Sequence, residues 1–220
     1  MGKPEDIFSL LALAVTCLGA GVLLTSCESI GGGSYGPGAG NFDTVVVDAG
    51  HGGHDRGAKA CSGSCEKILT LDTAHRLATV LRSQGFRVIE TRPTDDFVPL
   101  GGRTAISNGT FGAIFVSVHY NWTRRSKAHG IEIYYQSRQS RRLAANILRE
   151  ALGAYSTHSR GIKKRGFYVI RNNRRPAVLC ELGFVSNPSE NRSIQNPAVR
   201  QRIAESVATG ILAEKNGRQP

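Results

Sequence analysis

The chain has 220 residues, 40% of them hydrophobic, which is enough for one domain with a substantial core and short for two. Its formal net charge is +11, and because the first 26 residues hold one lysine against two acidic residues, a net −1, the remainder carries +12. Such an excess of positive charge favours an anionic partner, with a merely soluble basic surface as the alternative.

The first element is an apolar segment over residues 7–24, which contains no charge and is long enough to span a bilayer. A short charged start precedes it, and LTSC, which ends at Cys27, follows it. This order is typical of an export signal, and LTSC resembles the lipobox of bacterial lipoproteins, whose cysteine carries the lipid. We therefore expect residues 1–26 to be a signal peptide and Cys27 to be lipidated, with an uncleaved membrane anchor as the alternative.

Both interpretations place the folded part outside the cytoplasm, which argues against nucleic acid as the partner and favours anionic lipids or cell-wall polymers. Glu28 is not the aspartate that marks inner-membrane retention in some bacteria. We therefore expect a periplasmic lipoprotein of the cell envelope, held by the outer rather than the inner membrane. Residues 27–41 are rich in Gly and Ser and predict a flexible tether. The folded domain is expected over residues 42–216, with 217–220 as a tail.

Strand and helix patterns alternate along the folded part. A β-branched apolar run at 44–48 predicts a buried strand, and apolar residues at helical spacing predict a helix over 66–83 that stops at Gly85. Further strands are predicted at 86–92, 113–119, 130–136, 167–170 and 177–184, and further helices at 100–109 and 137–152.

Two more helices are marked by their first residues. Asn187 and Asn196 are each followed by a proline, which is typical of an N-cap and a first helical position, and Glu190 adds a capping carboxylate to the first of these helices. The alternation of strands and helices predicts a single α/β domain of three layers, with helices on both faces of a mostly parallel, twisted sheet.

Polar side chains follow three of the predicted strands. His51 comes after the first strand, His119 ends the strand at 113–119, and Glu181 lies in the strand at 177–184. Sites in such sheets form where strands end and loops begin. Strand-end placement alone does not show that these side chains converge, and a histidine there is more often structural than a ligand.

Four motifs occur along the chain in a fixed order: VVVDAGHGG with His51, then Glu66, then VSVHYN with His119, then AVLCELGFVSNP with Glu181. Together they resemble the zinc-dependent N-acetylmuramoyl-L-alanine amidases of the amidase-3 type, which are cell-wall hydrolases. The resemblance covers about residues 43–214. It implies that His51, Glu66 and His119 bind one Zn²⁺ per chain and that Glu181 is the catalytic acid/base.

The donor set suits this chemistry. Two imidazoles and one carboxylate leave an open position on a tetrahedral zinc ion, where bound water has a pKa of roughly 7. Glu181 would accept the proton of that water and pass it to the leaving amine. The resemblance implies that the bond cut is the amide between N-acetylmuramic acid and the L-alanine of the peptidoglycan stem peptide.

The sequence allows two alternatives to this function and excludes a third. The first is a non-catalytic cell-wall-binding lipoprotein on the same fold, and the second is a zinc peptidase on that fold. The third is a phosphate-binding loop, which is excluded because GHGGHDRG lacks both the Lys–Ser/Thr pair of a P-loop and the Gly-x-Gly-x-x-Gly spacing.

Four further residues are candidates for substrate contact. Asn121 follows His119 by two positions and either contacts the substrate or holds the turn. Arg171 and Arg174 can clamp stem-peptide carboxylates, or they belong to a solvated basic face. Trp122 either stacks on a sugar ring or caps its strand.

The loop around His51 holds other polar and glycine residues. His54 is expected to lie outside the metal site, and Asp48 either orients His51 or stabilises the turn. Gly50, Gly52 and Gly53 are expected to leave room for the substrate backbone.

The folded part contains three cysteines. Cys61 and Cys65 either form a small disulfide loop before Glu66 or stay reduced, and Cys180 is expected to be buried.

Peptidoglycan is the expected partner of a monomeric enzyme. Some members of the family carry a plug helix, whereas residues 136–160 have room for one helix and a short connection. We therefore expect an accessible site that needs no activator.

Overall fold

The structure is a computed structural model that describes residues 38–220. The predicted signal peptide, the lipid site at Cys27 and most of the predicted tether lie outside the described residues. Within residues 38–220, no helix combines the length and the apolar character that crossing a membrane requires.

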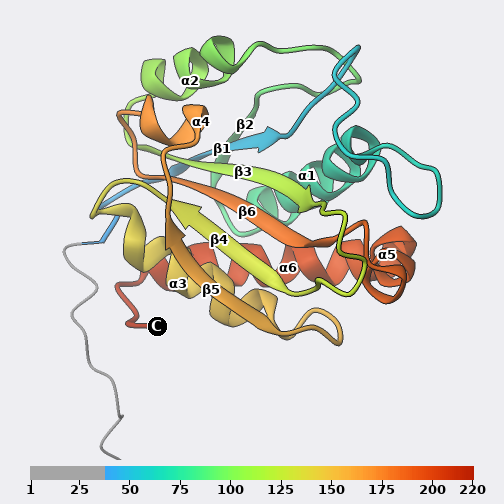
Figure 1. Ribbon diagram of the computed structural model, residues 1–220. Coiled ribbons are helices and arrows are strands. Elements are labelled where there is room, and N and C mark those ends of the chain that lie inside the picture. Colours follow the sequence, from blue (N-terminus) through green and yellow to red (C-terminus); the bar gives the residue numbers. More distant parts are fainter. Residues whose placement is uncertain (1–37) are drawn as a thin grey trace, which may run out of the picture. The chain divides into compact units, whose positions relative to one another are not determined.

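A six-stranded sheet forms the centre of the domain, in the order β2-β1-β3-β6-β4-β5. Every neighbouring pair is parallel except β4 and β6, which run antiparallel. The carboxyl ends of β1, β3 and β6 therefore meet at one edge of the sheet (Figure 1). The strands are Thr44–Ala49 (β1), Arg87–Glu90 (β2), Ala113–Asn121 (β3), Ile131–Tyr135 (β4), Ser159–Lys164 (β5) and Ala177–Phe184 (β6).

Helices cover both faces of this sheet, which confirms the three-layer α/β prediction. One face packs against α1, α3 and α6 through the larger apolar cluster, and the other packs against α2 and α4 through a smaller one (Figure 1). The helices are Glu66–Ser83 (α1), Leu100–Gly109 (α2), Ser140–Ala151 (α3), Tyr168–Arg171 (α4), Pro188–Gln195 (α5) and Pro197–Lys215 (α6).

Two elements differ from the sequence prediction. The predicted strand at 167–170 is instead the short helix α4, whose Val169 and Ile170 are buried against the sheet. Four residues are too few to show a period, so their aromatic and β-branched composition favoured the wrong element. The strand β5 was missed because SRGIKK is basic and largely open to solvent. Such a sequence suits an exposed edge strand, where charged residues prevent edge-to-edge pairing.

The two predicted N-caps are confirmed. The Asn187 side chain accepts hydrogen bonds from the backbone N–H groups of Ser189 and Glu190, and Asn196 does the same for Ala198. The capping role predicted for Glu190 is wrong. Its buried carboxylate accepts instead from the backbone N–H groups of Gly130 (2.9 Å) and Phe184 (2.7 Å), so it ties the start of α5 to β6 and to the loop before β4.

The chain enters the domain through a small polar cluster at the amino end of β1. The Ala39 N–H donates to Glu214 of α6 at 2.6 Å, and Arg142 and Asn146 of α3 donate to the same carboxylate. Asn146 also donates to the Arg218 carbonyl. Residues near both ends of the described chain are therefore fastened to the α3–α6 face.

Candidate functional site

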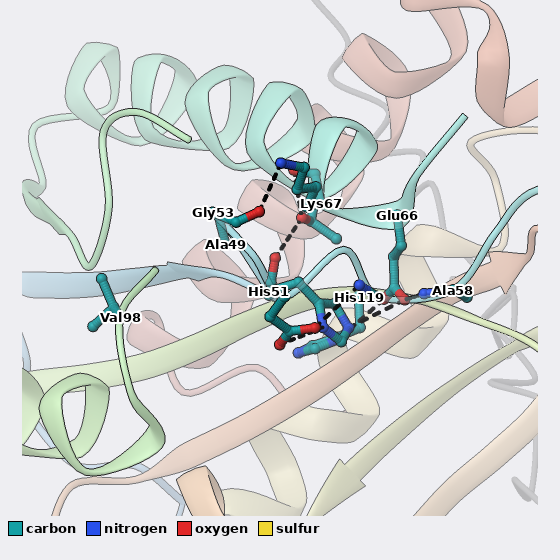
Figure 2. A network of polar contacts seen from close by, with 12 residues as sticks. Ala49, His51, Gly53, Ala58, Glu66, Lys67, Val98 and His119 are labelled. Carbon is teal, nitrogen blue, oxygen red and sulfur yellow. Dashed lines mark hydrogen bonds and ion pairs between the residues drawn. The ribbon is translucent and has the colours of Figure 1, made fainter. Parts of the chain in front are cut away.

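Three of the predicted site residues meet at the carboxyl edge of the sheet. His51 follows β1, His119 lies near the carboxyl end of β3, and Glu66 is the first residue of α1. Their ligand atoms all lie within 4.8 Å of one another. Figure 2 shows the two imidazoles and the carboxylate directed toward a common point. The structure thus brings together residues that are far apart in the sequence.

Glu66 is the centre of this cluster. One carboxylate oxygen lies 3.1 Å from Nε2 of His51 and the other lies 3.1 Å from Nδ1 of His119. The same oxygens accept hydrogen bonds from the backbone N–H groups of Ala58 (2.9 Å) and Tyr120 (3.1 Å). The buried side chain is therefore held by two imidazole nitrogens and two backbone N–H groups, which fix its carboxylate in place.

The electrostatics of the cluster favour an added positive charge. Burial alone would lower the pKa of His51, but hydrogen bonds and charge from Glu66 and Asp55 outweigh it and raise that pKa to about 9. Burial would raise the pKa of Glu66, and the two imidazoles instead hold it well below its usual range. A cluster that attracts protons in this way, with two nitrogen donors and one oxygen donor, fits a divalent cation such as zinc.

His51 is held in an unusual backbone conformation. Its φ of 62° is the only positive φ of a non-glycine residue among residues 38–220. This conformation costs roughly 1–3 kcal/mol and persists only where the surroundings impose it. Arg103 donates to the His51 carbonyl at 2.6 Å, and Asp55 lies 2.9 Å from Nδ1 of the ring. The strain and these contacts together aim Nε2 at Glu66.

Asp55, which the sequence analysis missed, therefore orients the His51 ring, a role that was considered for Asp48. The Asp48 carboxylate instead accepts hydrogen bonds from Arg103, Thr91 and Ser117. Asp48 therefore stabilises the turn, which was the second role that the sequence left open for it. A carboxylate on the second nitrogen of a ligating histidine fixes its tautomer and orientation. Residues 51–55 form a turn and not a helix, so the spacing of four residues between His51 and Asp55 gave no signal in the sequence.

Glu181 completes the site. It lies on β6 level with His119 on β3 and points to the same face of the sheet. Its Oε2 atom is enclosed and has no hydrogen-bond partner among the described residues. Burial raises the pKa of Glu181 to about 7, because the opposing charge of His119 is outweighed by burial together with Glu66 and Glu132. A carboxyl group of this kind can take up and release a proton near neutral pH.

Comparison with known proteins agrees with this geometry. Residues 45–213 match the Amidase_3 family model, which is described as N-acetylmuramoyl-L-alanine amidase. The chain belongs to this amidase family. The resemblance found in the sequence is thereby confirmed over most of the folded part.

Three relatives show how far the similarity extends. The catalytic domain of the amidase CwlV from Bacillus (Paenibacillus) polymyxa var. colistinus superposes with a TM-score of 0.76 at 33% identity, covering 81% of this chain and 100% of that one. The Bacillus subtilis protein YqiI is 36% identical over 76% of this chain and 82% of its own length. The amidase LytC of Bacillus subtilis is 31% identical over 78% of this chain, which spans only 35% of LytC.

The glycines of this amidase make room for its own side chains. A Cβ atom on Gly50 would lie 2.3 Å from the His119 ring, and one on Gly57 would lie 2.6 Å from the His51 ring. The space beside Gly52 and Gly53 is filled by the backbone of Asp96 and Phe97. The expectation that these glycines leave room for substrate is therefore wrong. They permit the close approach of the His51 and His119 rings and of the neighbouring loop.

We expect Gly50→Ala to lower kcat/KM by on the order of 10²-fold, because displacing the His119 ring by about 1 Å misaligns the site. The fold should remain, so the circular dichroism spectrum should be unchanged. Gly109→Ala is the matched control, since no atom lies within 4 Å of the added methyl group. Wild-type kinetics for Gly50→Ala would contradict the proposed packing.

We expect Asp55→Ala to weaken metal binding by about 10–100-fold, the effect typical of removing a carboxylate behind a ligating histidine. Competition with a zinc-binding dye measures this affinity. Asp43→Ala provides the control, because Asp43 bonds to Thr44 at the opposite end of β1. Equal affinities of the two variants would show that Asp55 does not position His51.

The expected substrate residues have separate locations. The Asn121 amide donates to Glu132 at 2.7 Å, while its oxygen accepts from the Trp122 N–H, so it holds the turn after β3. Arg171 is exposed at the end of α4. The Arg174 backbone binds Asn108 at the end of α2, which places it near the amino ends of the strands, away from the site.

The remaining expectations concern His54 and the three cysteines of the folded part. The His54 ring packs on Phe97, with 4.0 Å between ring centroids, and does not join the cluster. Cys61 and Cys65 are free thiols in the structure, and Cys180 is fully buried. Cys65 is the N-cap of α1 and directly precedes Glu66.

Proposed function

We propose that this amidase hydrolyses the amide bond between N-acetylmuramic acid and the L-alanine of the stem peptide in peptidoglycan. The observation that carries this proposal is the convergence of His51, Glu66 and His119 beside the unpaired carboxyl group of Glu181. A buried polar atom without a partner is unusual in a folded protein and marks a place for a reacting group. Membership of the amidase family supports the class of bond.

The three clustered residues are the proposed zinc ligands, one ion per chain. The atoms that face one another are Nε2 of His51, Nδ1 of His119 and the two carboxylate oxygens of Glu66. When bound, zinc supplies Lewis-acid chemistry that polarises a carbonyl group and lowers the pKa of water. The protein contributes the fixed orientation of the donors, through Asp55 on one imidazole and two backbone N–H groups on the carboxylate.

Glu181 is the proposed general acid/base. With a pKa near neutrality it accepts a proton from the attacking water and then donates it to the nitrogen of the leaving amine. The products are a lactyl carboxylate on the sugar and a free amino group on L-alanine. Because Oε2 makes no hydrogen bond within the described residues, the proton transfer breaks no existing contact of that atom.

The setting of the enzyme is also a proposal. Residues 1–26 act as a signal peptide, Cys27 carries the lipid, and the domain faces the periplasm from the outer membrane. Cell-wall amidases among the relatives support a place in the cell envelope. The proposed form is a monomer that needs no activator. The helix of the segment between β4 and β5 is α3, which packs on α6. Asn121 and Arg171 remain proposed substrate contacts.

Digestion of purified peptidoglycan tests the function. The full chain in detergent should release intact stem peptides and glycan with lactyl ends, as read by mass spectrometry. Chelator should stop the reaction and added zinc should restore it. Shortened stem peptides or cut crosslinks without lactyl ends would instead identify a zinc peptidase. Binding without any release would identify a non-catalytic wall protein.

A further inference from the structure

An apolar cavity of about 260 Å³ opens directly beside His51 and His119. It lies between the sheet and the α2–α4 layer, with Val169 and Leu179 in its wall. Its rim carries four exposed side chains, namely Phe97, Leu100, Phe167 and Tyr168. These are four of the seven large apolar side chains exposed among residues 38–220, so apolar surface is concentrated at this one place. Clustered exposed apolar groups mark a binding surface.

The apolar cavity offers no free charge. Asp48 and Arg103 border it, but they form an ion pair with each other at 2.7 Å. Asp55 is engaged by His51. A charged ligand group in this cavity would lose its hydration without gaining a partner, which is costly. The cavity therefore suits an uncharged group with one apolar face.

Charged side chains, in contrast to the apolar cavity, lie on the other side of Glu181. Glu132 on β4 is level with Glu181 on β6, and it binds Arg160 and Lys163 of β5. Beyond it, Arg125 and Lys127 line an open groove of about 550 Å³, which we call the basic groove. Glu132 and Arg160 also line this groove, but they pair with each other at 2.9 Å. Positive side chains of this kind bind carboxylates.

The proposed substrate has the same two-sided character. On one side of its amide bond is the ring of N-acetylmuramic acid, which is uncharged and has an apolar C–H face that can lie on aromatic side chains. On the other side is the stem peptide, which carries carboxylates. The apolar cavity is smaller than the roughly 300–1,000 Å³ of sites for drug-sized ligands, so it suits one ring rather than a polymer.

We propose that the apolar cavity is the subsite for the sugar ring of N-acetylmuramic acid, and that the stem peptide extends across Glu181 toward the basic groove. This assignment rests on the proposed function. Tyr168, exposed at the rim, is the side chain that contacts the ring. The direction in which the substrate lies across the site then follows from the difference in charge between the sugar and the stem peptide.

Binding of the two halves of the substrate tests the assignment without turnover. Peptide-free glycan strands and free stem peptide are titrated separately into the zinc-loaded full chain in detergent, by calorimetry. Tyr168→Ala should weaken glycan binding at least tenfold and leave peptide binding unchanged. Tyr168→Phe, which keeps the ring, should bind glycan nearly as the wild type does. Phe111→Ala is the control, because Phe111 is an exposed aromatic residue outside the cavity.

Kinetics on intact peptidoglycan give the second measurement. Tyr168→Ala should raise KM with little change in kcat, because the ring acts in binding rather than in proton transfer. If the wild type is active and Tyr168→Ala has unchanged glycan affinity and KM, the assignment is overturned. Weakened peptide binding would also overturn it, since it would place the peptide in the cavity. An inactive wild type that still loses glycan affinity on Tyr168→Ala would overturn the proposed function alone.

Discussion

Glu181→Gln is expected to lower kcat for peptidoglycan hydrolysis by about 10²–10⁴-fold, the contribution typical of a positioned acid/base. Glutamine has nearly the same size and fills the same partly buried position on β6, but it cannot carry the proton from water to the amine. The zinc content and the unfolding temperature should therefore stay at the wild-type values. Release of soluble stem peptide over time measures the rate.

The matched control for this prediction is Glu205→Gln on the exposed surface of α6, which should keep full activity. A Glu181→Gln variant within threefold of the wild type would show that another group moves the proton. A variant that loses zinc as well as activity would show that Glu181 is needed for metal binding, which the structure does not support, because Glu181 is absent from the cluster of His51, Glu66 and His119.

Glu66→Ala is expected to abolish both zinc binding and hydrolysis. The change removes one of the three proposed ligands and also the acceptor that holds the two imidazoles at 3.1 Å. It further leaves the partly buried N–H group of Ala58 and the buried N–H group of Tyr120 without their partner. Each unsatisfied buried donor costs about 1–3 kcal/mol, so the free energy of unfolding should fall even when chelator is present.

Metal analysis and urea unfolding, each with and without chelator, separate the two effects of Glu66→Ala. The wild type should lose stability when chelator removes the metal, while the variant should show no response to chelator. Glu150→Ala on α3 serves as the control, because its carboxylate bonds only to the neighbouring Arg149 among the described contacts. Retention of one zinc per chain by Glu66→Ala would contradict the proposed ligand set.

The sequence was sufficient to predict the centre of the site and the fold class. The four central residues lie in separated motifs whose order is specific, and parallel strands necessarily bring their carboxyl ends to one edge. The role of Asp55 was out of reach, because it depends on the φ of 62° at His51, which turns the chain back on the ring. No pattern of residue types predicts a positive φ at a histidine.

Arg174 shows a different limit of sequence reasoning. It follows Arg171 by three positions and shares its charge, so the two were treated alike. The helix α4 and the turn after it carry the chain from the cavity rim at Tyr168 to Asn108 near the amino ends of the strands. Proximity in sequence therefore did not translate into proximity to the site. The apolar residues at the cavity rim come from two segments far apart in the sequence, at the starts of α2 and α4, which only the fold brings together.

The hydrogen bond between Ala39 and Glu214 determines the point at which the amino-terminal segment is attached to the domain. Residue 38 meets the fold at the amino end of β1, while the site lies at the carboxyl end, about 20 Å away for six residues of strand. If Cys27 carries the lipid as proposed, residues 28–37 span at most about 36 Å when fully extended. The distance from the membrane at which the enzyme can work is then set by the tether length plus the depth of the domain. Lengthening the tether would move the zone of wall that is digested outward by a calculable amount.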